Sequence, residues 1–337
     1  MKFDVVIVGS GPAGLFAARE LETKFKVALI EKEGAVGHYG NRVINKDVFK
    51  ALRVSEDTIL NYINEISFIS PSGLTITTKK EGRGYVISKE KMQQDMFSQL
   101  QNTTTFMNSC VKEIDLLRNR VVTNDNVFEF DFLLAADGAH SSIRSQFSQE
   151  NPIIIKCFYG IFKKSKEPTS CVLSNKFARG FYGWSIDLGD TVEIGLGGFQ
   201  EPVHHFKDFL KNFFPSTTAL INEKRGFIPR SVVKRRVYEN CILIGDSTGG
   251  EPLMGSSIHK AIDEAKMASK LILENKHPKF YESLWEERFS KEFKFEESVR
   301  NKLDHMGDDD IDSFFLKKKE IKSEGLVTGL FKNLVTQ

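Results

Sequence analysis

The sequence predicts an α/β fold with a parallel sheet, and three observations predict it. A short apolar strand, Asp4–Val8, runs directly into a glycine-rich turn, Gly9–Gly14. A helix and a second apolar strand, Val27–Ile30, follow within one βαβ length. Two later apolar strands end at the acidic turns Asp137-Gly138 and Gly245-Asp246. Strands that are apolar on both faces are typical of parallel sheets covered by helices.

The glycine-rich turn has the spacing that a bound dinucleotide requires. Gly9 permits the tight turn, Gly11 lets the backbone approach a pyrophosphate, and Gly14 lets helix and strand pack closely. Pro12 and Ala13 complete the turn, and the helix that follows is expected from Leu15 to about Leu21, with free N–H groups and a positive end that attract phosphate. We therefore predict a Rossmann-type nucleotide site formed by these five residues.

An acidic residue completes this unit. Glu31, with Lys32 beside it, ends the second strand seventeen residues after Gly14. A carboxylate at this point can accept hydrogen bonds from a ribose diol. It argues against NADP, because it would repel a 2′-phosphate, but it does not choose between FAD and NAD.

The first acidic turn resembles a motif of FAD enzymes. Asp137-Gly138, Ser141 and Arg144 match the pattern DGxxSxxR of flavoprotein hydroxylases and their reductase relatives. The resemblance implies that Asp137 and Gly138 lie near the pyrophosphate. It also implies that Ser141 and Arg144 stabilise the turn into the next helix.

The second acidic turn resembles the GD motif of the same enzymes. The resemblance implies that Asp246 binds the ribityl chain of the cofactor. It also implies that the backbone of four later residues lies beside the flavin pyrimidine ring: Gly255, Ser256, Ser257 and Ile258. A helix N-terminus suits the negative charge of a reduced flavin. The predicted cofactor is FAD.

The middle of the chain resembles one family of flavoproteins. Phe181-Tyr182-Gly183-Trp184, followed by Gly195-Leu196-Gly197, is similar to the YxWxFP…GxG signature of the geranylgeranyl reductase family. The resemblance covers about residues 1–300 and implies that Tyr182 and Trp184 line a substrate cavity over the flavin. From the residues alone, alternate aromatic side chains on a strand are also compatible with ordinary core packing.

The chain departs from the family pattern at three places. The Phe-Pro of the signature is Ile186-Asp187, and the Cys-Gly-Glu loop aligns best with Tyr39-Gly40-Asn41. An arginine is replaced by Lys89, which keeps the charge but lacks the planar fork. The resemblance still implies cofactor contacts from Gly40, Lys89 and Val111.

The expected domains are discontinuous. We predict a glutathione-reductase/hydroxylase-like FAD-binding domain from residues 1–45, 80–150 and 232–278. A β-rich substrate domain is expected from residues 46–79 and 151–231, with C-terminal helices over 279–337. The last segment spaces apolar residues helically, and docking on the protein and contact with a lipid surface both remain open. These apolar residues are Leu326, Val327, Leu330, Phe331 and Leu334.

Composition limits the partners. The net charge of +2, with acidic and basic residues interspersed, gives no reason to expect nucleic acid. The four cysteines show no metal-binding spacing, and no apolar stretch approaches the length of a transmembrane helix. We expect a cytoplasmic protein without a metal, with peripheral membrane contact left open.

The predicted activity is FAD-dependent reduction of C=C bonds in a geranylgeranyl or other isoprenoid lipid. NAD(P)H and a ferredoxin-like carrier both remain possible electron donors. No catalytic residue is assigned, and His38 and Tyr39 are weak candidates for the proton donor. One alternative is a monooxygenase that uses NAD(P)H and O₂, and a second is a non-enzymatic prenyl-binding protein. The Tyr182-Gly183-Trp184 signature argues against the monooxygenase. The acidic residues Glu31, Asp137 and Asp246 are intact, which argues against the prenyl-binding protein.

Overall fold

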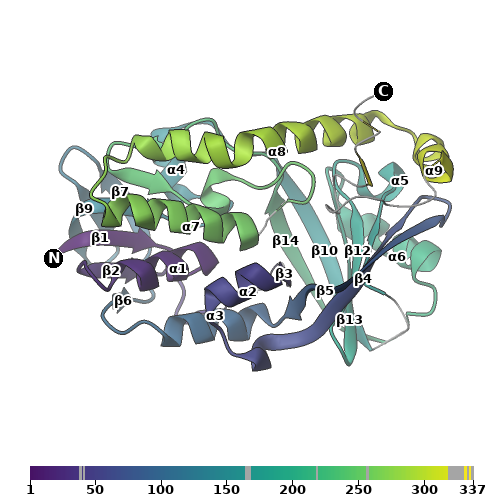
Figure 1. The fold of residues 1–337 in the computed structure, drawn as a ribbon, viewed down its shortest axis with the longest axis horizontal. Helices are drawn as coiled ribbons and strands as arrows, with labels where there is room; N and C mark the ends of the chain where they lie inside the picture. Colours follow the sequence, from purple (N-terminus) through teal and green to yellow (C-terminus); the bar gives the residue numbers. More distant parts are fainter. Residues whose placement is uncertain are drawn as a thin grey trace.

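The computed structural model describes residues 1–37, 40, 42–163, 168–217, 219–255, 258–317, 330, 331 and 334. Several residues singled out from the sequence lie outside the described residues: His38, Tyr39, Asn41, Ser256, Ser257, Leu326 and Val327. The described part forms two sheets of eight strands each. Figure 1 shows the two sheets side by side, with helices packed against each.

The first sheet contains the predicted βαβ unit. Its strands are β1 (Lys2–Val8), β2 (Val27–Ile30), β6 (Thr104–Phe106), β7 (Val111–Asp115), β8 (Arg120–Thr123), β9 (Val127–Ala135), β15 (Val237–Tyr238) and β16 (Cys241–Leu243). The order is β15-β16-β9-β1-β2-β6, and the strands from β16 to β6 are parallel. Strands β7 and β8 form an antiparallel meander on β9. The carboxyl ends of β1, β2, β9 and β16 therefore meet at one edge, where such sheets bind ligands.

Helices pack on one face of this sheet. They are α1 (Pro12–Leu21), α3 (Lys89–Ser98) and α7 (Ile258–Leu273), whereas α2 (Lys46–Leu52) packs against β3 and β5 of the second sheet and against α7. Ala261, Ala265 and Ala268 on α7 are all buried in the core cluster that includes residues of α1. These small side chains let the two helices approach closely. The short helix α4 (Ser142–Phe147) follows β9 after the first acidic turn.

The second sheet is mixed. Its strands are β3 (Val43–Asn45), β4 (Ile59–Ile69), β5 (Thr75–Ile87), β10 (Ile154–Lys163), β11 (Ser170–Val172), β12 (Gly183–Asp187), β13 (Thr191–Gly198) and β14 (Leu220–Pro229). The order is β14-β10-β13-β12-β11-β4-β5-β3, with β11 and β4 parallel. Two helices, α5 (Asn175–Ala178) and α6 (Pro202–Phe213), pack against it through a cluster rich in phenylalanine.

Strands β4 and β5 pair as antiparallel neighbours and form a hairpin around residues 66–77. The division into domains stays a prediction. Strand β5 continues without a break across residue 80, and β3 pairs with it. Both strands therefore belong to the second sheet rather than to the sheet of the nucleotide turn.

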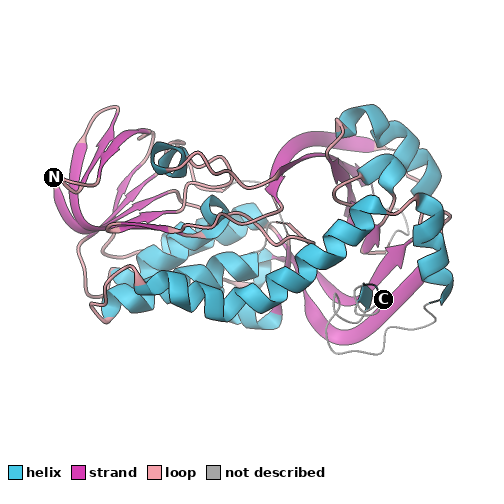
Figure 2. Cartoon of the chain, turned by 90° about the horizontal axis from the view of Figure 1, so that it is seen from above, coloured by secondary structure: helices cyan, strands magenta, loops and turns pink. Residues whose placement is uncertain are grey.

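The predicted C-terminal helices are α8 (Phe280–His305) and α9 (Asp308–Lys317). Figures 1 and 2 show α8 running from the side of the first sheet to that of the second. Leu330 and Phe331 are 0% and 2% exposed, in a cluster with Phe68 and Phe315. The docking alternative is confirmed for these two residues. Within the described residues, no helix combines the length and apolar character needed to cross a membrane.

Candidate functional site

The three glycines of the first turn have different surroundings. Gly9 has a φ of +104°, and a Cβ there would overlap the backbone of Ala136. A Cβ on Gly14 would overlap the carbonyl oxygen of Gly9. Among the described residues, no heavy atom lies within 4 Å of a Cβ built on Gly11. The protein's own packing therefore requires two of the glycines, whereas the third faces open space, as a pyrophosphate site requires.

Glu31 is tied to this turn. Its carboxylate is 4% exposed and accepts hydrogen bonds from the backbone N of Ser10 at 2.8 Å and from its hydroxyl at 2.6 Å. The backbone N of Glu33 donates a third bond at 3.0 Å. Glu31 thus fixes the glycine turn to the end of β2, and its partner Ser10 was not predicted from the sequence. The neighbouring Lys32 side chain is 70% exposed.

Asp137 lies at the carboxyl end of β9, next to the glycine turn. Its Oδ2 accepts hydrogen bonds from the backbone N of Ile143 at 3.1 Å and the hydroxyl of Ser142 at 3.3 Å. Burial raises the pKa of the Asp137 carboxyl, and the hydrogen bonds from α4 partly offset this. Its buried Oδ1 has no hydrogen-bond partner among the described residues. A buried acceptor of this kind fits a ligand that carries hydroxyl groups.

Gly138, with a φ of +84°, has open space at its Cβ position within the described residues. Arg144 holds the turn around it. The guanidinium, 2% exposed, donates to the carbonyl of Ala139 at 2.9 Å and to that of Ser247 at 2.6 Å. The hydroxyl of Ser141 accepts from the backbone N of Arg144 at 2.9 Å. Arg144 therefore joins the two acidic turns to each other.

The second acidic turn is the short helix η2 (Gly245–Thr248). Gly245 has a φ of +69°, and a Cβ there would lie 3.0 Å from Cβ of Ala13 in the first turn of α1. The carboxylate of Asp246 is close enough to Lys89 to act on its charge. Burial lowers the pKa of the Lys89 amine, and the nearby Asp246 opposes that shift. A Cβ on Gly40 would lie 2.6 Å from Nζ of Lys89. The structure thus brings these predicted residues together around one edge of the sheet.

The segment after this turn folds back on itself. Glu251 and Gly255 exchange two backbone hydrogen bonds of 2.9 Å. Gly255 has a φ of +83°, and a Cβ there would lie 2.9 Å from the ring of Phe181. Ile258, 4% exposed, begins α7. Val111 begins β7, and its side chain is buried in the core.

Of the predicted substrate residues, Tyr182 directly precedes strand β12 of the second sheet and contacts this segment, and Trp184 lies within the strand. Tyr182 stacks on Phe181 with 4.1 Å between ring centroids, and its hydroxyl donates to the carbonyl of Met254 at 3.1 Å. The indole N–H of Trp184 donates to Glu193 at 3.1 Å. Both rings are half-buried. Their contact with a substrate stays a prediction.

A buried ion pair beside Trp184 was not predicted from the sequence. Arg42 Nε and Glu193 Oε2 are 3.0 Å apart, with side chains 8% and 7% exposed. Burial raises the pKa of the Glu193 carboxyl, and the Arg42 guanidinium opposes this shift. The one sequence signal was a charged residue within the apolar strand Thr191–Gly198.

A second unexpected group is Glu296 on α8, which is 4% exposed. The backbone N of Leu253 donates to it at 3.3 Å. Burial and the nearby carboxylate of Glu251 raise the pKa of Glu296 to about 8. A carboxyl group that is protonated near neutral pH therefore lies behind the segment that Tyr182 contacts.

The chain is similar to known oxidoreductases. Residues 3–156 match the family described as pyridine nucleotide-disulphide oxidoreductase. The chain is 22% identical to digeranylgeranylglycerophospholipid reductase 1 of Methanococcoides burtonii, over 95% of this chain and 88% of that protein. It is 25% identical to digeranylgeranylglycerophospholipid reductase of Methanocaldococcus jannaschii, over 92% of this chain and 89% of that protein. The resemblance to the geranylgeranyl reductase family is confirmed. These similarities confirm the predictions that the protein is an oxidoreductase and that its cofactor is a flavin.

Solved structures show the same fold. A geranylgeranyl bacteriochlorophyll reductase-like protein from Thermoplasma acidophilum superposes with a TM-score of 0.84 at 21% identity, covering 99% of this chain and 96% of that one. A probable FAD-dependent monooxygenase from Pseudomonas aeruginosa superposes with a TM-score of 0.74 at 15% identity, covering 94% of this chain and 100% of that one. The predicted α/β fold with a C-terminal helical segment is therefore confirmed.

Proposed function

We propose that the protein is an FAD-dependent reductase that saturates C=C bonds of a geranylgeranyl or other isoprenoid lipid. Two sets of findings support this. Three nucleotide motifs, at Gly9–Gly14, Asp137-Gly138 and Gly245-Asp246, converge on one edge of a parallel sheet. The two relatives described above are named as reductases of digeranylgeranyl lipids.

One observation carries the proposal. The hydroxyl of Tyr182 donates a hydrogen bond to the carbonyl of Met254. This bond links Tyr182, next to strand β12 of the second sheet, to the segment that follows the Gly245-Asp246 turn. It supports a single site that combines the aromatic signature with the nucleotide motifs.

Different residues of the nucleotide motifs suit different parts of FAD. The open space at Gly11 and the N-terminus of α1 suit the pyrophosphate. The buried Oδ1 of Asp137 and the carboxylate of Asp246 are acceptors for hydroxyl groups, and Lys89 supplies a nearby positive charge. When bound, the cofactor supplies the hydride that a C=C bond receives.

The second sheet supplies the apolar side of the site. Tyr182 and Trp184 present ring faces that suit an isoprenoid chain and exclude water. A dry site strengthens electrostatic interactions with the reacting groups. The reaction also needs a proton source, and no residue is assigned to that role.

The electron donor, location and membrane contact are part of the same proposal. We propose a donor that binds transiently, either NAD(P)H or a ferredoxin-like carrier, since the sequence carries one dinucleotide fingerprint. A cytoplasmic location suits the four cysteines, which form no disulfide bond.

Contact with a membrane surface would bring the enzyme to its lipid substrate, but Leu330 and Phe331 are buried and are not free to make that contact. Co-sedimentation with lipid vesicles, with and without residues 325–337, would test whether the last segment contributes.

An absorbance spectrum and one turnover would test the reductase. The purified protein should bind FAD and, after anaerobic reduction, reoxidise when a geranylgeranyl lipid is added. Mass spectrometry should then show two hydrogens gained for each double bond reduced. Reduced flavin that stays reduced in the presence of the lipid would contradict the proposal.

The fold similarity to the probable monooxygenase favours one second candidate. That activity would consume O₂ and hydroxylate a small aromatic compound or a lipid. Oxygen uptake that depends on substrate, with incorporation of labelled oxygen into the product, would establish it. Oxygen consumption that yields only hydrogen peroxide would not establish a monooxygenase.

A further inference from the structure

A buried ion pair lies directly behind the Gly245–Thr248 turn. Lys260 and Glu264 stand one turn apart on α7, 2.9 Å from each other, with side chains 2% and 0% exposed. Removing two charges from water costs free energy that their attraction often fails to offset. A pair kept at this depth is therefore weak evidence for stability, and its other contacts are the better guide to its role.

Both charges hold the backbone of the turn. Glu264 accepts hydrogen bonds from the backbone N of Gly245 at 2.6 Å and from the hydroxyl of Thr248 at 2.9 Å. Lys260 donates to the carbonyls of Gly245 and Gly249, each at 3.1 Å, and to the hydroxyl of Thr248 at 2.6 Å. The first and last residues of the turn are thus fixed from one helix.

The Gly245–Thr248 turn begins at a glycine and is followed by Gly249, and these two glycines explain why its backbone needs support from α7. Gly245 and Gly249 have φ values of +69° and +106°. Glycine populates many backbone conformations, so a turn with glycine at both ends is not fixed by its own sequence. Asp246 lies between the fixed points, and its carboxylate is close to Lys89. The position of Asp246 therefore depends on contacts from α7.

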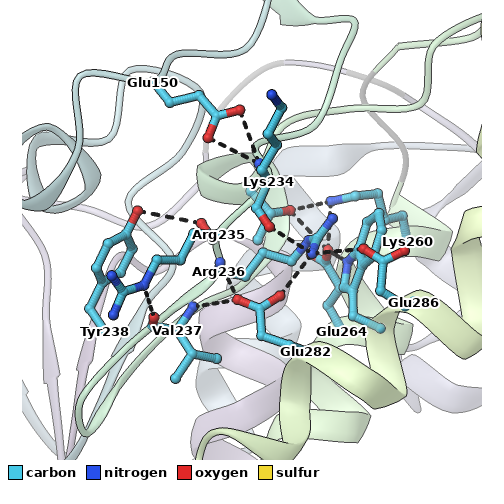
Figure 3. Close-up of polar contacts among 12 residues, drawn as sticks. Glu150, Lys234, Arg235, Arg236, Val237, Tyr238, Lys260, Glu264, Glu282 and Glu286 are labelled. Carbon is cyan, nitrogen blue, oxygen red and sulfur yellow. Dashed lines mark hydrogen bonds and ion pairs between the residues drawn. The ribbon is translucent and has the colours of Figure 1, made fainter.

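A second set of contacts fixes Glu264 itself. The indole N–H of Trp285, on α8, donates to Glu264 at 2.6 Å. The guanidinium of Arg236 lies 3.3 Å above the Trp285 ring and pairs with Glu282 at 2.8 Å and Glu286 at 3.2 Å. Figure 3 shows Arg236 between the carboxylates of α8 and the Lys260–Glu264 pair. Polar contacts and ring packing thus run from the surface of α8 to the turn.

We propose that Lys260 and Glu264 are positioning residues for the cofactor. They hold the Gly245–Gly249 turn in the shape in which Asp246 binds FAD, while Trp285 and Arg236 hold Glu264. The benefit is preorganisation, because a turn that is already fixed loses little conformational freedom when it binds its ligand. This inference rests on the proposed binding of FAD at Asp246.

The variant Glu264→Gln, with Asp263→Asn as its control, would test the proposal. Asp263 is the adjacent residue and joins the same two helices through Arg288 at 2.7 Å, with side chains 29% and 50% exposed. FAD would be titrated into each FAD-free protein. Loss of a hydrogen bond to a charged group corresponds to a change of about 10- to 100-fold in affinity. We expect E264Q to bind FAD at least about tenfold more weakly, and D263N to bind it as the wild type does.

The visible circular dichroism of the bound FAD provides the readout that a purely structural role would not change. It reports how the flavin is held, so E264Q should alter it and D263N should not. Failure of the wild type to bind FAD would refute the proposed function and not this inference alone. If the wild type and E264Q bind FAD with equal affinity and identical circular dichroism, the positioning role is overturned.

A second variant decides the matter if E264Q does not fold. Thr248→Val removes only the hydroxyl that lies between the two charges. Its far-ultraviolet circular dichroism should match the wild type, while its affinity for FAD falls several-fold. An unchanged affinity for FAD in this variant would overturn the proposal.

Discussion

The ring of Trp184 lies across the backbone of Gly195. The two residues are paired in register on the antiparallel strands β12 and β13, and a Cβ on Gly195 would overlap the indole. A Cβ on Gly197 would likewise lie 2.7 Å from the ring atom Cδ1 of Phe181. The glycines of the second half of the signature therefore make room for the aromatic rings of the first half.

This relationship predicts the effect of Gly195→Ala. The added methyl group must displace the Trp184 ring, and overpacking of this kind costs about 1–3 kcal/mol of unfolding free energy. Gly226→Ala on β14 is the control, because no heavy atom among the described residues lies within 4 Å of its Cβ position. Urea unfolding followed by tryptophan fluorescence would measure both. Equal stability of the two variants would show that the ring does not occupy this position.

Arg42→Met should destabilise the protein strongly. The substitution removes the positive charge 3.0 Å from the buried Glu193 carboxylate, and burial already disfavours the charged form of that carboxyl group. Removing one partner of a buried pair costs about 3–5 kcal/mol. Arg120→Met is the matched control, since its pair with Glu129 is 2.8 Å long but nearly half-exposed on both sides. If unfolding experiments gave the two variants similar losses, the Arg42–Glu193 pair would not be buried as described.

Asp137→Asn should have opposite effects on stability and on binding. Burial raises the pKa of Asp137 in the folded state, so its stabilising contribution is present at low pH and is lost as pH rises through the folded pKa. The variant should therefore unfold at a higher temperature than the wild type at pH 7, measured without FAD. Below about pH 4, where the unfolded Asp is protonated, the difference should vanish. Its affinity for FAD should fall, and parallel losses in both measurements would contradict the assignment.

Glu296 should make the free energy of unfolding depend on pH over a different range, from about pH 4.5 to about pH 8. Its pKa is raised to about 8, from an ordinary value of 4.5. The stability of the wild type should therefore be greatest below pH 4.5 as far as this group is concerned, and should decline towards about pH 8. A difference of one in pKa between the folded and unfolded states corresponds to about 1.4 kcal/mol of unfolding free energy.

The variant Glu296→Gln isolates this effect. Its melting temperature should exceed that of the wild type increasingly from pH 5 to pH 8 and then by a constant amount. Melting curves at intervals of half a pH unit would measure it, with Glu297→Gln, the next residue of α8, as the control. A constant difference between E296Q and the wild type across this range would contradict the raised pKa.

The sequence predicts the nucleotide unit well, because each of its signals is local. The strand Val27–Ile30 has the expected bounds, since an apolar run between polar ends leaves little choice. The first helix begins at Pro12 rather than at the expected Leu15, because proline suits the first turn of a helix. Gly9 and Gly14 are required by the turn itself, and that requirement is visible in their spacing.

The residues that support the site were harder to predict. Arg42 and Glu193 are 151 positions apart, and neither belongs to a motif. Lys260 and Glu264 have the spacing of an ordinary surface pair on a helix, which gives no sign of their burial. Such contacts depend on how the two sheets and α8 pack, and a single sequence carries no signal for that packing.

The long helix α8 has a consequence for how the two halves of the molecule can move. At its N-terminal end Trp285 contacts the residues behind the Gly245 turn, and near its C-terminal end Arg300 donates to the carbonyl of Phe181 at 3.0 Å. A helix of 26 residues is a stiff rod of about 39 Å. It therefore holds the nucleotide turn and the residues around Phe181 at a fixed separation, with or without a ligand. A long flexible lipid that bound at the proposed site would then have to adapt its own conformation to the protein.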